Sequence, residues 1–233
     1  MKFIIENKVF ESLNNLCIAF VIAKGINNTN KIYEISYMLK NIISNSQKEF
    51  ENIKIKESNY IKCYRDAFQK LNINPNKFMC SIEALLTRIQ KKKSIPEINS
   101  IVDLTNAISI KYKLPIGAHD LDSMNEDFYI RYSVNEDTFL PFGESEIEKI
   151  DNNELIYVVK NDVRTRRWIW RQSEYGKIIE SSTNIIFPID AFTDANYNRA
   201  IIARDDLSNL LKKFFNCEII TGILDSKNNF IEF

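Results

Sequence analysis

The sequence contains little of the chemistry that many enzymes use. It has one histidine, His119, which excludes a metal centre built on several histidines. Its five glycines are spread over 233 residues and form no glycine-rich phosphate loop. No Gly-x-Ser-x-Gly motif holds a nucleophilic serine. If the protein is an enzyme, we expect it to position water and polarise a carbonyl group, without a covalent nucleophile.

Cysteine pairs and long apolar runs are also missing. The cysteines, Cys17, Cys63, Cys80 and Cys217, form no Cys-x-x-Cys motif, so a structural zinc is not expected and a reducing compartment is favoured. The apolar run at 16–23 is far shorter than the ~20 residues that a membrane span needs. We therefore expect a cytoplasmic protein with no membrane contact.

The net charge limits the class of partner. Lys and Arg total 31 and Asp and Glu total 31, so no strong overall field attracts nucleic acid, although a local basic surface remains open. One such surface is Lys91 to Lys93, which follows a predicted helix. Lysines at this place complement the helix dipole, and contact with phosphate is the alternative interpretation.

Hydrophobic periodicity predicts an α+β fold. Residues 16–23 are apolar on both faces, as in a central strand. Helical spacing predicts helices over 30–44, 58–71, 100–111 and 205–215. A further helix is predicted to begin at Ser81, which would cap it. Strands are predicted at 128–132, 138–142, 154–160, 163–172, 184–189 and 218–224. We expect one compact unit with a mixed or antiparallel sheet core, flanking helices and paired ends.

Two strand pairings follow from these patterns. The segment 138–142 is expected to pair with 128–132. Asn161-Asp162 is expected to be the turn that joins 154–160 to 163–172 in a hairpin.

The stretch TRRWIWRQS at 165–173 holds both tryptophans. On a strand, one face would carry Arg166, Trp168, Trp170 and Gln172, and the other Arg167, Arg171 and Ser173. Two interpretations stay open. The indoles are core with solvated arginines around them, or they form a wall on which nucleobases stack while the arginines contact phosphate.

Polar residues on an apolar helix form a second candidate. Asp103 and Asn106 lie one turn apart on the helix predicted over 100–111. Such groups either find partners in neighbouring backbone or face a cavity.

Three segments carry a resemblance to a known family: CSIEALLTR at 80–88, NSIVDLTNAISIKYKLPIGAHDLD at 99–122, and RRWIWRQSEYGKIIESSTNIIF at 166–187. They resemble the free-standing relatives of the editing domain of the bacterial phenylalanyl-tRNA synthetase beta chain, a tRNA synthetase B3/B4-type domain. The resemblance implies an amino-terminal α/β extension at 1–74, an editing-like domain at 75–190, and a carboxyl-terminal helix and strand at 191–233 that pack on the first segment.

The resemblance implies a trans-editing aminoacyl-tRNA deacylase, which hydrolyses the ester of a wrong amino acid. Its partners are mischarged tRNA and a possible synthetase, and it needs no metal or organic cofactor. Asn106 and His119 would position water or the ester carbonyl. The residues that would shape the pocket or hold the tRNA end are Arg167, Trp168, Trp170, Arg171, Gln172 and Ser173. If the substrate amino acid has a cationic side chain, it would be bound by Glu83, Asp103, Asp120 or Asp122.

Two departures from the synthetase pattern leave the amino acid open. Gly117 stands where that pattern has a histidine, and Gln172 where it has a glutamate that reads a tyrosine hydroxyl. Tyrosine and canavanine are both candidates for the rejected amino acid. The departures also keep open a non-catalytic module that binds tRNA or an amino acid, and a small-molecule binding protein.

Overall fold

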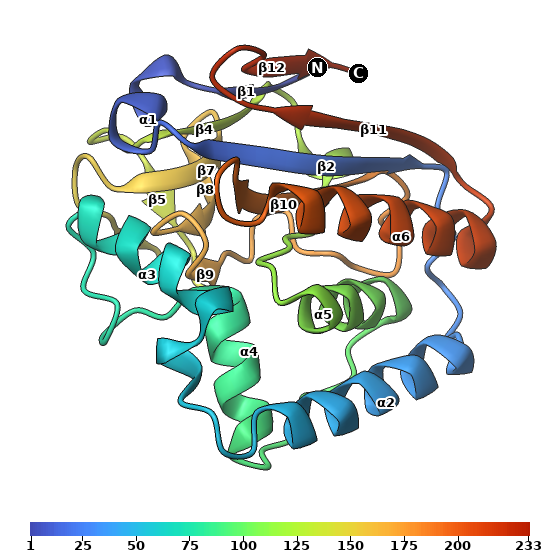
Figure 1. Ribbon diagram of the computed structural model, residues 1–233. Helices are drawn as coiled ribbons and strands as arrows, with labels where there is room; N and C mark the ends of the chain where they lie inside the picture. The colour runs from blue at the N-terminus through green and yellow to red at the C-terminus, as the bar shows by residue number, and fades with distance from the viewer.

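The computed structural model describes residues 1–233, which form two β-sheets flanked by α-helices (Figure 1). The larger sheet has the strand order β12-β1-β4-β7-β8-β5-β6, with β9 beside β8, and the smaller sheet has the order β11-β2-β10-β3. Both parallel and antiparallel pairs occur in the larger sheet. The predicted α+β class, a single unit with a mixed sheet and flanking helices, is confirmed.

The strands have the following bounds: β1 Lys2–Ile5, β2 Leu16–Lys24, β3 His119–Asp120, β4 Phe128–Tyr132, β5 Thr138–Phe139, β6 Glu148–Lys149, β7 Leu155–Val159, β8 Asp162–Arg166, β9 Arg171–Gln172, β10 Ile185–Phe192, β11 Glu218–Leu224 and β12 Phe230–Glu232. The helices are α1 Asn7–Ser12, α2 Tyr33–Glu49, α3 Asn59–Lys70, α4 Ser81–Gln90, α5 Ser100–Tyr112 and α6 Tyr197–Phe215. None of these helices combines the length and apolarity that crossing a membrane requires.

The two central strands of the smaller sheet, β2 and β10, are buried on both faces, as predicted for 16–23. Leu16, Ile18 and Phe20 of β2 join a core that also holds residues of the larger sheet, α3 and α4. Their neighbours Cys17 and Ala19 point into a second core, formed with α5 and α6. Figure 1 shows α5 and α6 on the same side of this sheet, with α2 beyond α5.

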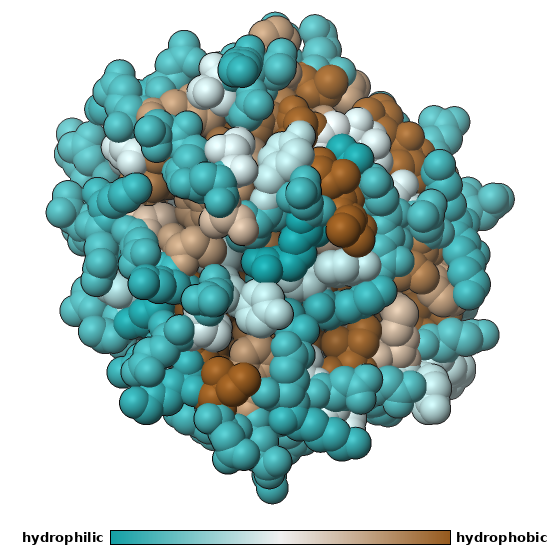
Figure 2. Space-filling view, in the orientation of Figure 1, coloured by the Kyte–Doolittle hydropathy of each residue, from teal (hydrophilic) through white to brown (hydrophobic).

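The two ends of the chain meet in the larger sheet, as expected. β1 pairs antiparallel with β12 and parallel with β4. The outer surface in the same view is mainly hydrophilic, with small apolar patches between polar residues (Figure 2).

All five predicted helices are present, and two of them, α6 and α4, differ in how they start. α6 begins at Tyr197, well before the predicted 205, because its first turns bury only the small Ala200 and Ala203, a weak apolar signal. The predicted cap at Ser81 is wrong. Cys80 is the capping position, and the backbone N–H of Ser81 donates to the carbonyl of Ile169 at 2.9 Å.

One strand pairing is wrong and one is nearly right. Of the predicted strand 138–142, only β5 forms, and it pairs with β8 and β6. It cannot pair with β4 (128–132) as expected, because β1 and β7 occupy both edges of β4. The predicted hairpin exists between β7 and β8. Its turn lies one residue earlier than expected, with Lys160 in the left-handed region at φ 52°.

The predicted strand 163–172 is interrupted, which overturns the expected alternation of its side chains. β8 ends at Arg166, and a turn over 167–170 separates it from β9. Arg167 and Trp168 both adopt left-handed backbone, with φ 47° and 59°. Trp168 is therefore fully buried, whereas Trp170 is only partly buried and Arg167 stacks on its ring, 4.8 Å from the centroid.

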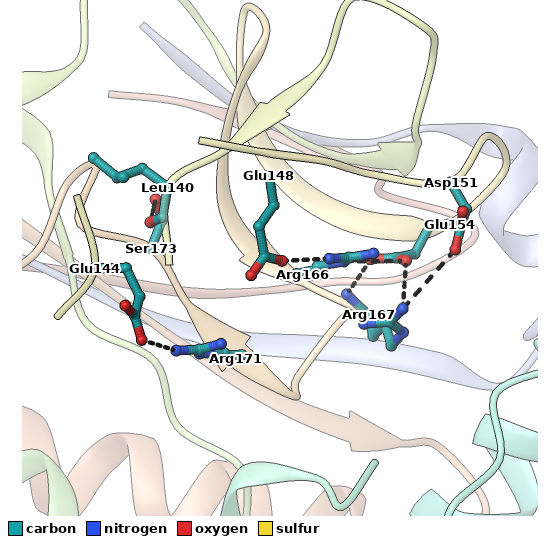
Figure 3. Close-up of polar contacts among 9 residues, drawn as sticks. All are labelled: Leu140, Glu144, Glu148, Asp151, Glu154, Arg166, Arg167, Arg171 and Ser173. Carbon is teal, nitrogen blue, oxygen red and sulfur yellow. Dashed lines mark hydrogen bonds and ion pairs between the residues drawn. The ribbon is translucent and has the colours of Figure 1, made fainter. Parts of the chain in front are cut away.

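Glu154 holds this turn in place (Figure 3). Its carboxylate accepts from Nε of Arg166 at 3.0 Å and from the backbone N–H of Arg167 at 3.0 Å. The Arg167 guanidinium lies 3.5 Å from the same carboxylate, and that of Arg166 also contacts Glu148 at 2.8 Å. Left-handed backbone at non-glycine residues costs about 1–3 kcal/mol each, so the turn needs such partners to persist.

Replacement of Glu154 tests this role. Glu154→Ala should lower the free energy of unfolding by about 3 kcal/mol, because the buried guanidinium of Arg166 loses its main partner. Asp151→Ala is the matched control: Asp151 is 87% exposed and 3.9 Å from Arg167, so its loss should change stability by less than about 0.5 kcal/mol. Urea unfolding of both variants measures the difference. Equal effects would contradict the assignment.

Candidate functional site

A central cavity of about 570 Å³ opens beside α5, the loop that follows it, and the turn at 167–170. This volume lies in the range of small-molecule sites. The cavity is lined by Ile98, Val102, Thr105, Asn106, Ile116, Ala118, Phe142, Trp170, Arg171, Gln172, Lys177 and Ile178. Its walls are therefore mainly apolar, with two amides and two cations, and no carboxylate is among them.

Asn106 and Gln172 are the polar centre of the cavity. Asn106 lies on α5. The start of this helix is fixed by Asn99, whose side chain accepts from the backbone N–H of Val102. The Asn106 amide makes no hydrogen bond within the protein. Gln172 donates through Nε2 to the carbonyl of Ala118 at 2.9 Å, and its amide oxygen has no protein donor. Both amides thus present unused hydrogen-bonding atoms beside the cavity.

A basic groove of about 480 Å³ adjoins the central cavity and shares Asn106 and Gln172 with it. Arg88, Lys91 and Lys93 line it at the carboxyl end of α4. None of these three cations pairs with an acidic side chain, and Arg88 donates instead to the carbonyl of Ser94 at 2.6 Å. The groove is therefore a local positive surface on a chain without net charge.

A third hollow, the inner chamber, measures about 80 Å³ and reaches the other two at Gln172. His119, Tyr157, Trp168 and Asp190 line it. Asp190 accepts from the hydroxyl of Tyr157 at 2.7 Å and from the indole N–H of Trp168 at 2.6 Å. Burial raises the pKa of Asp190 to about 7 even though both hydrogen bonds favour its ionised form.

His119 is neutral in this environment. Burial, with a smaller contribution from Arg164, lowers its pKa to about 3. The ring stacks on Tyr157 with centroids 5.7 Å apart, and neither ring nitrogen has a hydrogen-bond partner. His119 does not pair with its neighbour Asp120, which accepts from the hydroxyl of Ser182 at 2.9 Å and from the N–H of Asp122 at 2.9 Å.

The structure brings some of the sequence-predicted residues together. Asn106, Trp170, Arg171 and Gln172 line the central cavity, and His119 and Trp168 line the inner chamber. Arg167 and Ser173 line neither. Ser173 is fully buried, and its hydroxyl donates to the carbonyl of Leu140 at 2.7 Å.

The carboxylates proposed for a cationic side chain lie outside the central cavity. Glu83 pairs with Arg65 at 2.6 Å, and burial raises its pKa despite that partner. Asp103 accepts from the N–H of Ile98 at 3.0 Å, away from Asn106. Asp122 accepts from Thr183 and Asn184. No group of three or more His, Cys, Asp or Glu side chains is arranged to hold a metal ion.

Several lining residues were not predicted. Lys177 and Ile178 come from a loop without periodicity, and Phe142 was placed in a predicted strand but lies in the loop after β5. Asp190 did carry a signal, because it is a charged residue inside the apolar strand β10. Buried charges without a cation need an explanation, and that reasoning would have singled it out.

Comparison with known proteins places the chain in a family. The model of the B3/4 domain matches residues 63–226, which is more than half of the chain. The phenylalanine–tRNA ligase beta subunit of Malacoplasma penetrans (strain HF-2) is 26% identical over 98 residues, which are 42% of this chain and 12% of that protein. The chain thus spans a small part of the length of this relative.

A solved structure is similar at low identity. It is an N-terminal fragment of the phenylalanyl-tRNA synthetase beta-subunit from Pyrococcus horikoshii, with a TM-score of 0.48 and 9% identity, over 87% of this chain and 46% of that chain. The resemblance found in the sequence is confirmed by the family match, and the chain belongs to the B3/4 domain family.

Proposed function

We propose that this protein is a trans-editing hydrolase that removes a wrong amino acid from mischarged tRNA in the cytoplasm. The observation that carries the proposal is the meeting of an apolar cavity and a basic groove at two unused amides, Asn106 and Gln172. The relative named as a phenylalanine–tRNA ligase beta subunit supports the choice of an aminoacyl-tRNA as substrate.

In this proposal, the basic groove and the central cavity would each hold a part of the substrate. Phosphates near the 3′ end of tRNA would contact Arg88, Lys91 and Lys93, because unpaired cations in a groove attract the backbone. The ester would then lie at the junction. There the Asn106 amide N–H can donate to the ester carbonyl oxygen and stabilise the negative charge that develops during attack by water.

The lining of the central cavity favours an uncharged amino acid. Val102, Phe142, Trp170 and Ile178 supply apolar surface, and the charged groups present are the cations Arg171 and Lys177. A cationic side chain would find no carboxylate in the lining, because the nearby Glu144 and Glu174 already pair with Arg171 and Lys177, and an unpaired charge is costly after desolvation. Tyrosine therefore suits the cavity better than canavanine.

A non-catalytic binding module on the same scaffold is the second candidate. The observation that favours it is the position of the only histidine, His119, which is buried outside the central cavity and held neutral. Incubation of the protein with tRNAs charged with near-cognate amino acids separates the two. Catalytic release of an uncharged amino acid supports the hydrolase, whereas tight binding without release across the panel supports the module.

Asn106 is the first residue to test. Asn106→Ala should lower kcat by about 10²-fold with little change in tRNA affinity, because one donor to the developing oxyanion is lost. Lys111→Ala is the control, since Lys111 lies on the same helix, pairs with Asp206 and does not line the cavity. Single-turnover deacylation measures the rate. Equal rates for the two variants would remove Asn106 from the proposed mechanism.

The lysine run offers an internal control for tRNA binding. Lys91 and Lys93 line the groove, whereas Lys92 between them does not. Lys91→Gln and Lys93→Gln should each weaken binding and reduce the slope of log K against log salt by about 0.7. Lys92→Gln removes the same charge and should leave the slope nearly unchanged. Filter binding at several salt concentrations measures this, and three equal slopes would place the tRNA elsewhere.

A further inference from the structure

The inner chamber is the smallest of the three hollows and has room for water. Its volume of about 80 Å³ exceeds the roughly 10–15 Å³ that a cavity needs to hold one water. It shares Ile116, Trp170 and Gln172 with the central cavity. A water in the chamber would therefore stand next to the place where the ester is expected.

Polar groups that lack partners point to such water. Both ring nitrogens of His119 are without hydrogen bonds, and Nδ1 is fully buried. Asp190 uses Oδ1 for both of its hydrogen bonds, so Oδ2 accepts none from the protein. Ordered water is the usual partner of buried polar groups that the chain leaves unsatisfied.

Asp190 is also a carboxylate without a cation. It is 2% exposed, and its two partners, Tyr157 and Trp168, are neutral donors. It makes no ion pair, in contrast to Glu83 and Glu154, which have arginine partners. Asp103 and Asp120 are also buried without a cation, but each accepts from a backbone N–H, which Asp190 does not. A buried carboxylate that lines a hollow and has a free oxygen can accept a proton from a water molecule.

The other titratable groups around Asp190 are neutral near pH 7. Burial raises the pKa of Tyr157 on β7, of Tyr64 on α3 and of Cys17 on β2, and burial lowers that of His119 on β3. No charged side chain forms an ion pair with Asp190. A pH change near neutrality would therefore alter the charge of Asp190 and leave its neighbours unchanged.

We propose that Asp190 is the general base that activates the hydrolytic water of this site. The inference rests on the proposed deacylase function. The carboxylate takes a proton from a water in the inner chamber while the water oxygen forms a bond to the ester carbonyl carbon. The bond between that carbon and the ribose oxygen then breaks, and the proton passes from Asp190 to the leaving ribose oxygen. The products are the free amino acid and tRNA with its terminal hydroxyl restored.

Asp190→Asn tests the assignment without changing the size of the side chain. The amide oxygen can still accept from Tyr157 and Trp168, so the variant should fold. We expect kcat to fall by at least about 10²-fold, with KM and tRNA affinity unchanged. In the wild type, the rate should rise with pH through an apparent pKa near 7, because only the ionised carboxylate accepts a proton. This rise, the acid limb of the pH–rate profile, should be absent from the residual activity of the variant.

Tyr157→Phe separates a base from a structural residue. The Tyr157 hydroxyl lowers the pKa of Asp190 by hydrogen bonding to its ionised form. Removing the hydroxyl should move the acid limb of the rate profile to higher pH, an effect that a purely structural carboxylate would not produce. Asp194→Asn is the control, because this acid contacts Asn15 on the surface and should leave both rate and profile unchanged.

A readout that does not need activity follows from the Trp168 contact. The indole N–H of Trp168 donates to Asp190, so its NMR resonance should titrate near pH 7 in the wild type and stay constant in Asp190→Asn. Trp170→Phe assigns the signal, since the chain has two tryptophans.

The possible results are distinguishable. If the wild type is active and Asp190→Asn keeps the same rate and acid limb, the assignment of Asp190 as the base is overturned. The proposed deacylase function then still stands. A wild type that releases no amino acid from any tRNA overturns both. If circular dichroism shows that Asp190→Asn does not fold, the Tyr157→Phe variant decides the question. An acid limb that does not shift in Tyr157→Phe overturns the proposal.

Discussion

The architecture depends on one constraint, which is that β2 and β10 are apolar on both faces and must be covered from both sides. The larger sheet covers one face, and α5 and α6 cover the other. The loop after α5 is then fixed along β10, because the backbone N–H of Gly117 donates to the carbonyl of Pro188 at 2.9 Å and the backbone N–H of Asp190 donates to that of Pro115 at 3.1 Å. Gln172 continues this chain of contacts through Ala118. The three hollows lie where these segments meet.

The polar groups at the junction differ in how strongly the fold restrains them. Asn106 has no protein partner and Gln172 has one, so both can respond to a ligand. Asp190 is held by two donors and surrounded by neutral groups, so its charge is decided by burial and its orientation by Tyr157 and Trp168. The junction thus combines two amides with unused hydrogen-bonding atoms and one carboxylate whose orientation is fixed by the fold.

Sequence patterns predicted the parts of the fold that rest on local periodicity. The run at 16–23 and the apolar helix with Asn106 were identifiable because their side-chain spacing is regular. The turn at 167–170 was not, since neither Arg167 nor Trp168 is of a type that marks left-handed backbone, and their conformation depends on Glu154, which is distant in sequence. The cavity residues Phe142 and Lys177 belong to loops whose position is set by the whole fold. Asn106 was found by asking where a polar group on an apolar element goes, and the same question identifies Asp190.

Gly117 has a consequence for the inner chamber. A methyl group at this position would lie 3.1 Å from Nε2 of His119 and 3.7 Å from Pro188. Any side chain there would compete with the imidazole for the same space. Gly117 and Asp190 line the same chamber, so a side chain at position 117 would reduce the space that the chamber offers to solvent.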